Sequence, residues 1–210
     1  MPGQRALVLP AAGALALASA WCWPAPAPLL PSIAPLLGIP CRLSTGGVAI
    51  TFDDGPHPEG TPAVLESLAA AGATATFYLV GEQVERWPRV AARIADEGHE
   101  IALHGQIHRL LLRRPTRTLR VDLTRALDVI GEATGRVPSS YRPPYGVFSA
   151  GALALVQELG LAPLLWSRWG RDWGARETPE LIARRATRNL GDGDVVLLHD
   201  ADHYSAPGSW

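Results

Sequence analysis

The sequence has little net charge, few cysteines and no internal repeat. Its 19 basic and 20 acidic residues leave a formal net charge of −1, and the basic residues form no stripe, so the composition gives no support for nucleic-acid binding. The only two cysteines, Cys22 and Cys41, lie near the N-terminus, where a disulfide in an oxidising compartment and two free thiols are both compatible with the sequence. The chain also lacks an H-E-x-x-H motif, which argues against a metalloprotease.

Charge is nearly absent from residues 6–40. Residues 6–23 are rich in alanine and leucine, a proline-rich segment follows, and Ala18-Ser19-Ala20 fits an A-x-A cleavage site. We therefore expect residues 1–41 to comprise a signal peptide or an uncut membrane anchor, followed by a proline-rich linker, and we exclude them from the expected fold. Both alternatives predict a domain outside the cytoplasm.

From residue 42 to residue 210, strand-like runs alternate with helix-like runs. This alternation predicts an α/β domain with a parallel sheet covered by helices. Strands are expected over residues 48–52, 74–79, 100–103, 140–142, 162–166 and 194–198. Helices are expected from Thr61-Pro62 to Gly72, from Pro88 to Gly98, over 118–134, over 149–159 and from Thr178-Pro179 onward, with Thr61 as an N-cap.

The first strand, VAITF, ends in two adjacent carboxylates, Asp53 and Asp54. In a barrel of parallel strands, the residues that follow each strand share one rim. That rim would collect Asp53, Asp54, His104, His108, Arg142, Tyr145, Asp172, Trp173 and His199. Such a concentration of carboxylates and histidines predicts a catalytic site.

A metal site is predicted from Asp54, His104 and His108. The two histidines stand four residues apart in HGQIH, so on a helical turn both imidazoles would face one cation. Two histidines and a carboxylate with open positions suit Zn²⁺ as a catalytic metal, and other divalent first-row ions also fit. Asp53 would then take a proton from the attacking water, and His199 would act as an acid from the other side.

Five short motifs occur in order between residues 48 and 200: TFDDGP (51–56), HGQIH (104–108), RPPYG (142–146), RDW (171–173) and LLH (197–199). Together they resemble the motifs of the polysaccharide deacetylases, the NodB-homology family that is also grouped as carbohydrate esterase family four. The resemblance implies a distorted (β/α) barrel. It also implies metal-dependent removal of an acetyl group from a sugar amide.

Residue roles follow from the same resemblance. It implies that Asp53 is the base, that Asp54, His104 and His108 bind the metal, and that His199 protonates the leaving amine. Arg142 would hold Asp53 and keep it charged, and Asp172 would raise the pKa of His199. The backbone N–H of Tyr145 would help to bind the oxyanion, while Trp173 and Leu197 would wall the pocket for the acetyl methyl.

Two departures from the family pattern stand out. Gly105 follows His104 where the family usually has serine or threonine, a hydroxyl that would steady the loop. The chain ends 11 residues after His199, so we expect a domain that lacks its last helix and strand.

The sequence leaves several functional alternatives open. The leading hypothesis is a monomeric deacetylase of N-acetylated glycans, either peptidoglycan or chitin-like, that is secreted or membrane-anchored. An esterase that removes O-acetyl groups, as on xylan, would use the same site. A truncated, non-catalytic remnant is the alternative outside the enzymes.

Overall fold

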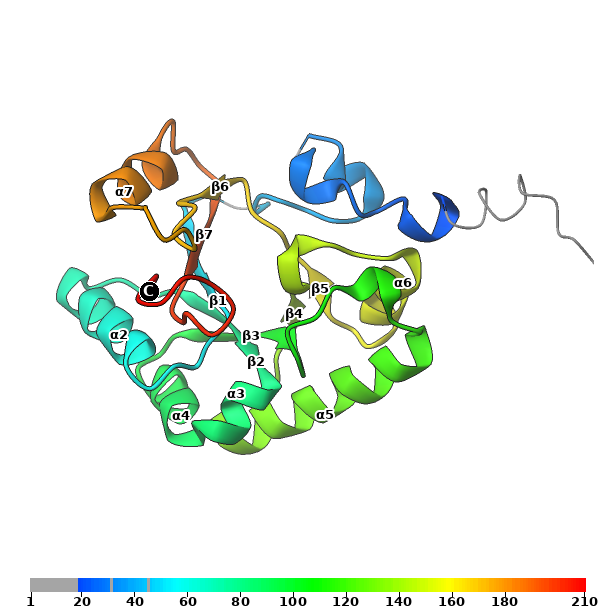
Figure 1. Cartoon of the computed structure of the whole chain (residues 1–210), viewed down its shortest axis with the longest axis horizontal. Coiled ribbons are helices and arrows are strands. Elements are labelled where there is room, and N and C mark those ends of the chain that lie inside the picture. Colours follow the sequence, from blue (N-terminus) through cyan, green and yellow to red (C-terminus); the bar gives the residue numbers. More distant parts are fainter. Residues whose placement is uncertain (1–18, 31, 45) are drawn as a thin grey trace, which may run out of the picture.

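The computed structural model describes residues 19–30, 32–44 and 46–210. Its centre is a single sheet of seven strands: β1 (Ala49–Asp53), β2 (Thr76–Val80), β3 (Glu100–Gly105), β4 (Ser140–Tyr141), β5 (Ala162–Pro163), β6 (Arg168–Trp169) and β7 (Val195–His199). Neighbouring strands pair in parallel in the order β5-β4-β3-β2-β1-β7-β6. The sheet curls into an open half-barrel (Figure 1), which confirms the predicted α/β class and distorted barrel.

Helices surround this sheet on its outer side (Figure 1). They are α2 (Gly60–Ala71), α3 (Gly81–Arg86), α4 (Pro88–Asp96), α5 (Thr116–Thr134), α6 (Ala150–Glu158) and α7 (Pro179–Thr187). Within residues 19–30, 32–44 and 46–210 there are also four 3₁₀ turns: η1 (Ala27–Leu29), η2 (Ala34–Leu37), η3 (Leu111–Arg113) and η4 (Pro144–Gly146). The 19-residue α5 follows the predicted helical spacing, since Leu119, Leu123 and Ile130 are all buried.

The prediction of elements was wrong in three places. Strand β6 and helix α3 were not expected, and both are short, at two and six residues. Thr61 is not an N-cap, because α2 begins one residue before it and no side chain caps that helix. The Thr61 hydroxyl instead donates a hydrogen bond to the buried carboxylate of Asp200. Thr178, in contrast, caps α7 through its hydroxyl, which accepts a hydrogen bond from the Leu181 N–H.

Register explains why chemically useful residues meet at one rim. In the β1–β7 pairing, Asp53 lies opposite His199, each at the C-terminal end of its strand. On the other side of β1, Asp53 is in register with Tyr78 of β2. Because the strands are parallel, their C-terminal ends point the same way, and the rim expected from the sequence is present.

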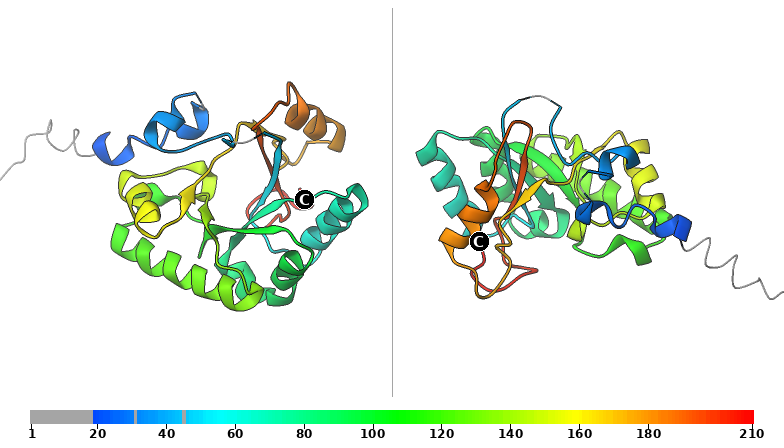
Figure 2. Two further views of the ribbon diagram at one scale, coloured as in Figure 1. Left: turned by 180° about the vertical axis from the view of Figure 1, so that it is seen from behind. Right: turned by 90° about the horizontal axis from the view of Figure 1, so that it is seen from above.

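The proline-rich segment expected to be a linker packs against the domain instead. The side chains of Ala34 and Ile39 are buried in the core, and the carbonyl of Pro40 accepts a hydrogen bond from the Leu165 N–H. This segment lies across the open side of the curled sheet (Figures 1 and 2). Its small and apolar side chains fill the space there. The apolar composition of this segment is therefore explained by its packing in the core of the domain.

The expected leader lies almost entirely outside the described residues, which begin at Ser19. Among the residues that are described, no helix has the length and hydropathy needed to span a bilayer. Both cysteines in this region are free thiols, so the structure contains no Cys22–Cys41 disulfide. Burial of Cys41 raises the pKa of its thiol to about 11.

We predict that Ile39→Ala destabilises the whole domain. The Ile39 side chain is 0% exposed, and truncating a buried isoleucine to alanine costs about 2–5 kcal/mol of unfolding free energy. Leu36→Ala is the matched control, because Leu36 lies on the same segment and is 84% exposed. Urea unfolding followed by far-UV circular dichroism measures both variants. Equal stability of the two variants would show that this segment does not share the domain's core.

Candidate active site

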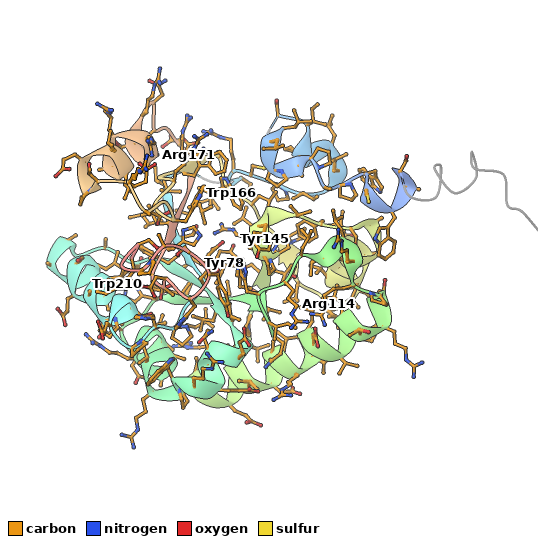
Figure 3. All side chains as sticks on the ribbon, in the orientation of Figure 1. Tyr78, Arg114, Tyr145, Trp166, Arg171 and Trp210 are labelled. Carbon is orange, nitrogen blue, oxygen red and sulfur yellow. The ribbon has the colours of Figure 1, made fainter. Side chains whose placement is uncertain are left out.

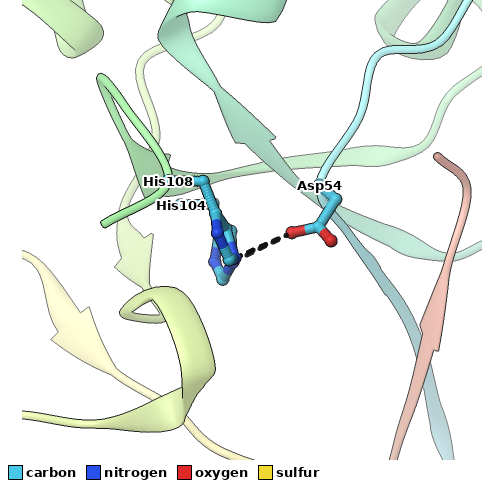
Figure 4. Close-up of side chains that lie close together, drawn as sticks. All are labelled: Asp54, His104 and His108. Carbon is cyan, nitrogen blue, oxygen red and sulfur yellow. Dashed lines mark ion pairs between the residues drawn. The ribbon is translucent and has the colours of Figure 1, made fainter. Parts of the chain in front are cut away.

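Three buried side chains converge at the rim of the sheet (Figure 4). Asp54 Oδ1 lies 3.4 Å from His104 Nε2 and 3.3 Å from His108 Nε2. The ligand atoms of all three residues lie within 4.8 Å of one another. Asp54 follows directly after β1 with a φ of 81°, an unusual backbone conformation for a residue other than glycine, and one that is often found at functional sites.

The geometry of this triad fits a divalent cation. Metal–ligand bonds of about 2.0–2.1 Å at tetrahedral angles place neighbouring ligand atoms about 3.3 Å apart, and the two Asp54–histidine distances are 3.3 and 3.4 Å. Asp54 Oδ1 is buried and has no hydrogen-bond partner among the described residues. A carboxylate oxygen isolated in this way is strongly disfavoured unless a cation neutralises it.

The protonation of His104 supports the same interpretation. Its Nδ1 lies 2.8 Å from the carbonyl oxygen of Arg142, and a carbonyl can only accept, so Nδ1 carries the proton. In the neutral imidazole, Nε2 then presents a lone pair to the Asp54 carboxylate. Burial lowers the pKa of His108 to about 4. His108 is therefore neutral at pH 7, which is the form that binds metals.

The predicted helical turn through HGQIH was wrong, although its two histidines do converge. His104 is part of β3, and His108 lies in the loop that follows. The chain turns at Gly105, whose φ is 108°, a conformation that residues with a Cβ rarely adopt. The imidazoles thus meet because the loop folds back on the strand, and not because of helical periodicity.

Asp53 lies beside the triad and is held by Arg142. The Arg142 guanidinium, 0% exposed, donates to Asp53 Oδ1 at 2.6 Å and to Thr51 Oγ1 at 2.8 Å. Two further N–H groups donate to the carbonyl oxygens of Leu164 and Leu165, each at 3.1 Å. Every charge in this buried pair is therefore compensated, as a buried ion pair requires.

His199, the register partner of Asp53 on β7, pairs with Asp172. Asp172 accepts hydrogen bonds from the His199 backbone N–H at 2.6 Å and from Nδ1 at 2.9 Å. Burial disfavours the charged imidazole, but the hydrogen bond and the charges of Asp172, Asp54 and Asp53 outweigh it and raise the pKa of His199 to about 9. His199 is therefore protonated at pH 7, and its Nε2 lies 4.0 Å from Asp54 Oδ2.

Eight of the ten site residues predicted from the sequence line one cavity of about 360 Å³. They are Asp53, Asp54, His104, His108, Tyr145, Trp173, Leu197 and His199. The other two, Arg142 and Asp172, are buried and hydrogen-bonded to residues of this cavity. Tyr145, labelled in Figure 3, has a φ of 61° and exposes 59% of its surface.

Further residues complete the wall of this cavity. Trp166, Trp169 and Tyr204 all line it, and Trp166 is buried. Gly146 allows Trp166 to approach, since a Cβ there would come within 2.4 Å of the indole. No sequence signal identified Tyr204, which lies in an irregular segment after β7.

Tyr204 contacts the metal-ligand candidate His108 directly. Its ring stacks on the imidazole with centroids 4.3 Å apart and planes inclined by 11°. The Tyr204 hydroxyl donates to Glu82 and accepts from Gln83, both on α3. His108 Nδ1, by contrast, has no hydrogen-bond partner among the described residues. Aromatic contacts therefore orient the His108 ring. In most metal sites the orientation of a histidine ligand is instead fixed by a hydrogen bond from its other ring nitrogen.

The sequence and the fold are both similar to those of known proteins. The model of the polysaccharide deacetylase family matches residues 42–164, which is more than half of the chain. A chitooligosaccharide deacetylase of Azorhizobium caulinodans is 34% identical over 168 residues, which are 79% of this chain and 80% of that protein. The chain belongs to the polysaccharide deacetylase family, whose members are metal-dependent.

Other similar proteins differ in length and in activity. Peptidoglycan-N-acetylglucosamine deacetylase PgdA of Listeria monocytogenes is 30% identical over 81% of this chain, which spans only 36% of that protein. Peptidoglycan deacetylase PdaC from Bacillus subtilis matches with a TM-score of 0.69 and 31% identity, covering 79% of this chain and 80% of that chain. A family pseudoenzyme from Bacillus anthracis matches with a TM-score of 0.70 and 25% identity, covering 75% and 56%. The fold alone therefore does not establish activity.

We predict that Tyr204→Ala weakens binding of a divalent metal. Without the stacked ring, His108 loses a contact that orients it, and changes in the groups that support a metal ligand typically cost about 10–100-fold in affinity. The measurement is competition for Zn²⁺ between the protein and a chromophoric chelator. Tyr204→Phe is the matched control, because it keeps the ring and removes only the hydroxyl. Unchanged Zn²⁺ affinity in Tyr204→Ala would show that stacking does not position His108.

Proposed function

We propose that this chain is a metal-dependent hydrolase that removes acetyl groups from the nitrogen of N-acetylated glycans. The observation that carries the proposal is the arrangement in one cavity of a metal-binding triad, a carboxylate and a charged histidine. Asp53 precedes Asp54 in the chain, His199 Nε2 lies 4.0 Å from Asp54 Oδ2, and all three residues line the same cavity, so a base and an acid are both within reach of an amide bound there. The chain thus has the residues that the chemistry requires, in addition to the fold.

Asp53 and His199 divide the proton transfers between them. A divalent metal held by Asp54, His104 and His108 would polarise the acetyl carbonyl and activate water for attack. Asp53 accepts the proton of the attacking water while Arg142 fixes its carboxylate. His199, kept protonated by Asp172, donates a proton to the leaving nitrogen. The backbone N–H of Tyr145 is the proposed donor to the oxyanion, and Leu197 and Trp173 are the proposed walls around the acetyl methyl.

Metal identity and location are part of the same proposal. Two neutral imidazoles and one carboxylate with room for further ligands suit Zn²⁺ as the catalytic ion. The apolar, alanine- and leucine-rich residues 6–20 support a location outside the cytoplasm, either secreted or membrane-anchored. Glycans of the cell wall would be accessible to a domain in that location.

Release of acetate from an N-acetylglucosamine tetramer tests the proposal. The full chain with Zn²⁺ should release acetate, a chelator should abolish the release, and Asp53→Asn should lower kcat by about 10²–10⁴-fold through loss of the base. O-acetylated xylan serves as the comparison substrate. Acetate from xylan alone would identify an esterase, and no acetate from folded, metal-loaded protein would identify a non-catalytic member.

A folding control is needed because Asp53 pairs with a buried arginine. Removing one partner of such a pair destabilises proteins by about 3–5 kcal/mol, so Asp53→Asn requires a thermal melt at the assay temperature. A folded variant that still binds Zn²⁺ but releases no acetate would assign the loss to the chemical step.

We predict that Asp172→Asn moves the basic limb of the pH–rate profile to lower pH. The pKa of His199 is raised to about 9, so the proton that it donates is available at neutral pH and is lost as the pH rises through about 9. Without the Asp172 charge, this pKa falls, and the limb should shift down by about 1–3 pH units. Asp96→Asn, an exposed change on α4, should leave the profile unchanged. An unshifted limb in Asp172→Asn would exclude His199 as the group that titrates.

A further inference from the structure

A second cavity, of about 430 Å³, lies next to the active-site cavity and is lined by four arginines. Arg168, Arg171, Arg185 and Arg188 form it together with Ser167, Trp169 and Asn189. We call this cavity the arginine groove. No carboxylate is among its lining residues, so the field within it is positive.

Two of the four arginines form ion pairs with carboxylates of the protein, and the other two do not. Arg168 pairs with Asp194, and Arg185 pairs with Glu177. Arg171 and Arg188 have no ion-pair partner among the described residues, and both are exposed. Two guanidinium groups are therefore available for an external anion.

Arg171 has an unusual backbone conformation and lies close to Trp169. Its φ is 60°, a conformation that is uncommon for a residue with a side chain. The guanidinium lies 5.2 Å from the centroid of the Trp169 ring, within the range of a cation–π contact. Figure 3 shows Arg171 and Trp166 on the same part of the molecule, near the position of β6 in Figure 1.

Trp169 connects the two cavities, because it lines both of them. Its ring lies 5.6 Å from that of Trp173, which is packed edge-on against His199. The faces of these indoles are apolar surfaces of the kind on which sugar rings stack. A glycan whose reacting sugar occupies the active site would therefore extend over Trp169 towards Arg171 and Arg188.

We propose that the arginine groove binds a carboxylate carried by the sugar next to the one that is deacetylated. This proposal rests on the proposed function, since it assumes a glycan in the active-site cavity. A guanidinium matches a carboxylate through two parallel hydrogen bonds, and Arg171 and Arg188 supply two such groups. The groove would then favour acidic glycans over neutral chitin-like glycans.

Equilibrium binding to the metal-loaded, full-length Asp53→Asn variant tests this proposal without turnover. Calorimetric titration compares three glycans of equal length: an N-acetylglucosamine oligomer, a peptide-free strand that alternates N-acetylglucosamine with N-acetylmuramic acid, and a hyaluronan oligosaccharide. The second glycan carries lactyl carboxylates and the third carries ring carboxylates, so the comparison identifies the source of the anion. A carboxylate glycan should bind more tightly than the neutral oligomer, and raising NaCl from 50 to 200 mM should reduce that preference.

Arg171→Gln combined with Arg188→Gln removes the two unpaired charges. This double change should weaken binding of the preferred carboxylate glycan about tenfold or more, because it removes the charge-assisted hydrogen bonds of two guanidinium groups, and should leave the neutral oligomer unaffected. Arg184→Gln is the matched control, since Arg184 lies on α7 outside the groove. Equal binding of all three glycans, or full affinity in the double variant, would overturn the proposal.

The two proposals fail in different ways. If the wild-type enzyme releases acetate from the neutral oligomer and no glycan shows a carboxylate preference, only the arginine groove proposal fails. If no glycan is deacetylated while the carboxylate glycans still bind through Arg171 and Arg188, the enzymatic proposal fails and the groove stands.

Discussion

The buried guanidinium of Arg142 connects the parts of the site more directly than any other group. It binds the Asp53 carboxylate at the end of β1 and the carbonyls of Leu164 and Leu165, which follow β5. The carbonyl of the same residue fixes the tautomer of His104. One residue thus joins the sheet across its curled interior and orients both a base candidate and a metal-ligand candidate. A cation buried this completely is stable only because each of these acceptors is in place.

The rim could be predicted from the sequence because parallel strands determine it. Once the apolar runs ending at Asp53, His104 and His199 are taken as neighbouring parallel strands, their ends must meet. The path between them could not be predicted. The turn after His104 depends on the positive φ of Gly105. The spacing of four residues between His104 and His108 is equally compatible with a helical turn, so the spacing alone could not predict this loop. Strand β6 has two residues, too few for any periodicity to show.

Contacts between segments that are distant in the chain could not be predicted from the sequence either. Tyr204 follows the last strand in a segment without regular structure, yet its ring stacks on His108 and its hydroxyl bonds to two residues of α3. Ile39 belongs to a stretch whose composition resembles that of a linker, yet it is buried in the core. Each position depends on the shape of a surface formed by residues far away in sequence, and local patterns carry no information on that shape.

Two histidines at this rim show how environment, and not residue type, sets their chemistry. His108 and His199 are both largely buried, and burial alone would make each neutral. For His108 burial dominates and lowers the pKa to about 4, since Nδ1 has no hydrogen-bond partner among the described residues that would favour the charged form. His199 is bonded to the carboxylate of Asp172, so its pKa rises to about 9. At pH 7 the first histidine can therefore bind a cation and the second can donate a proton, which is the division of labour that amide hydrolysis needs.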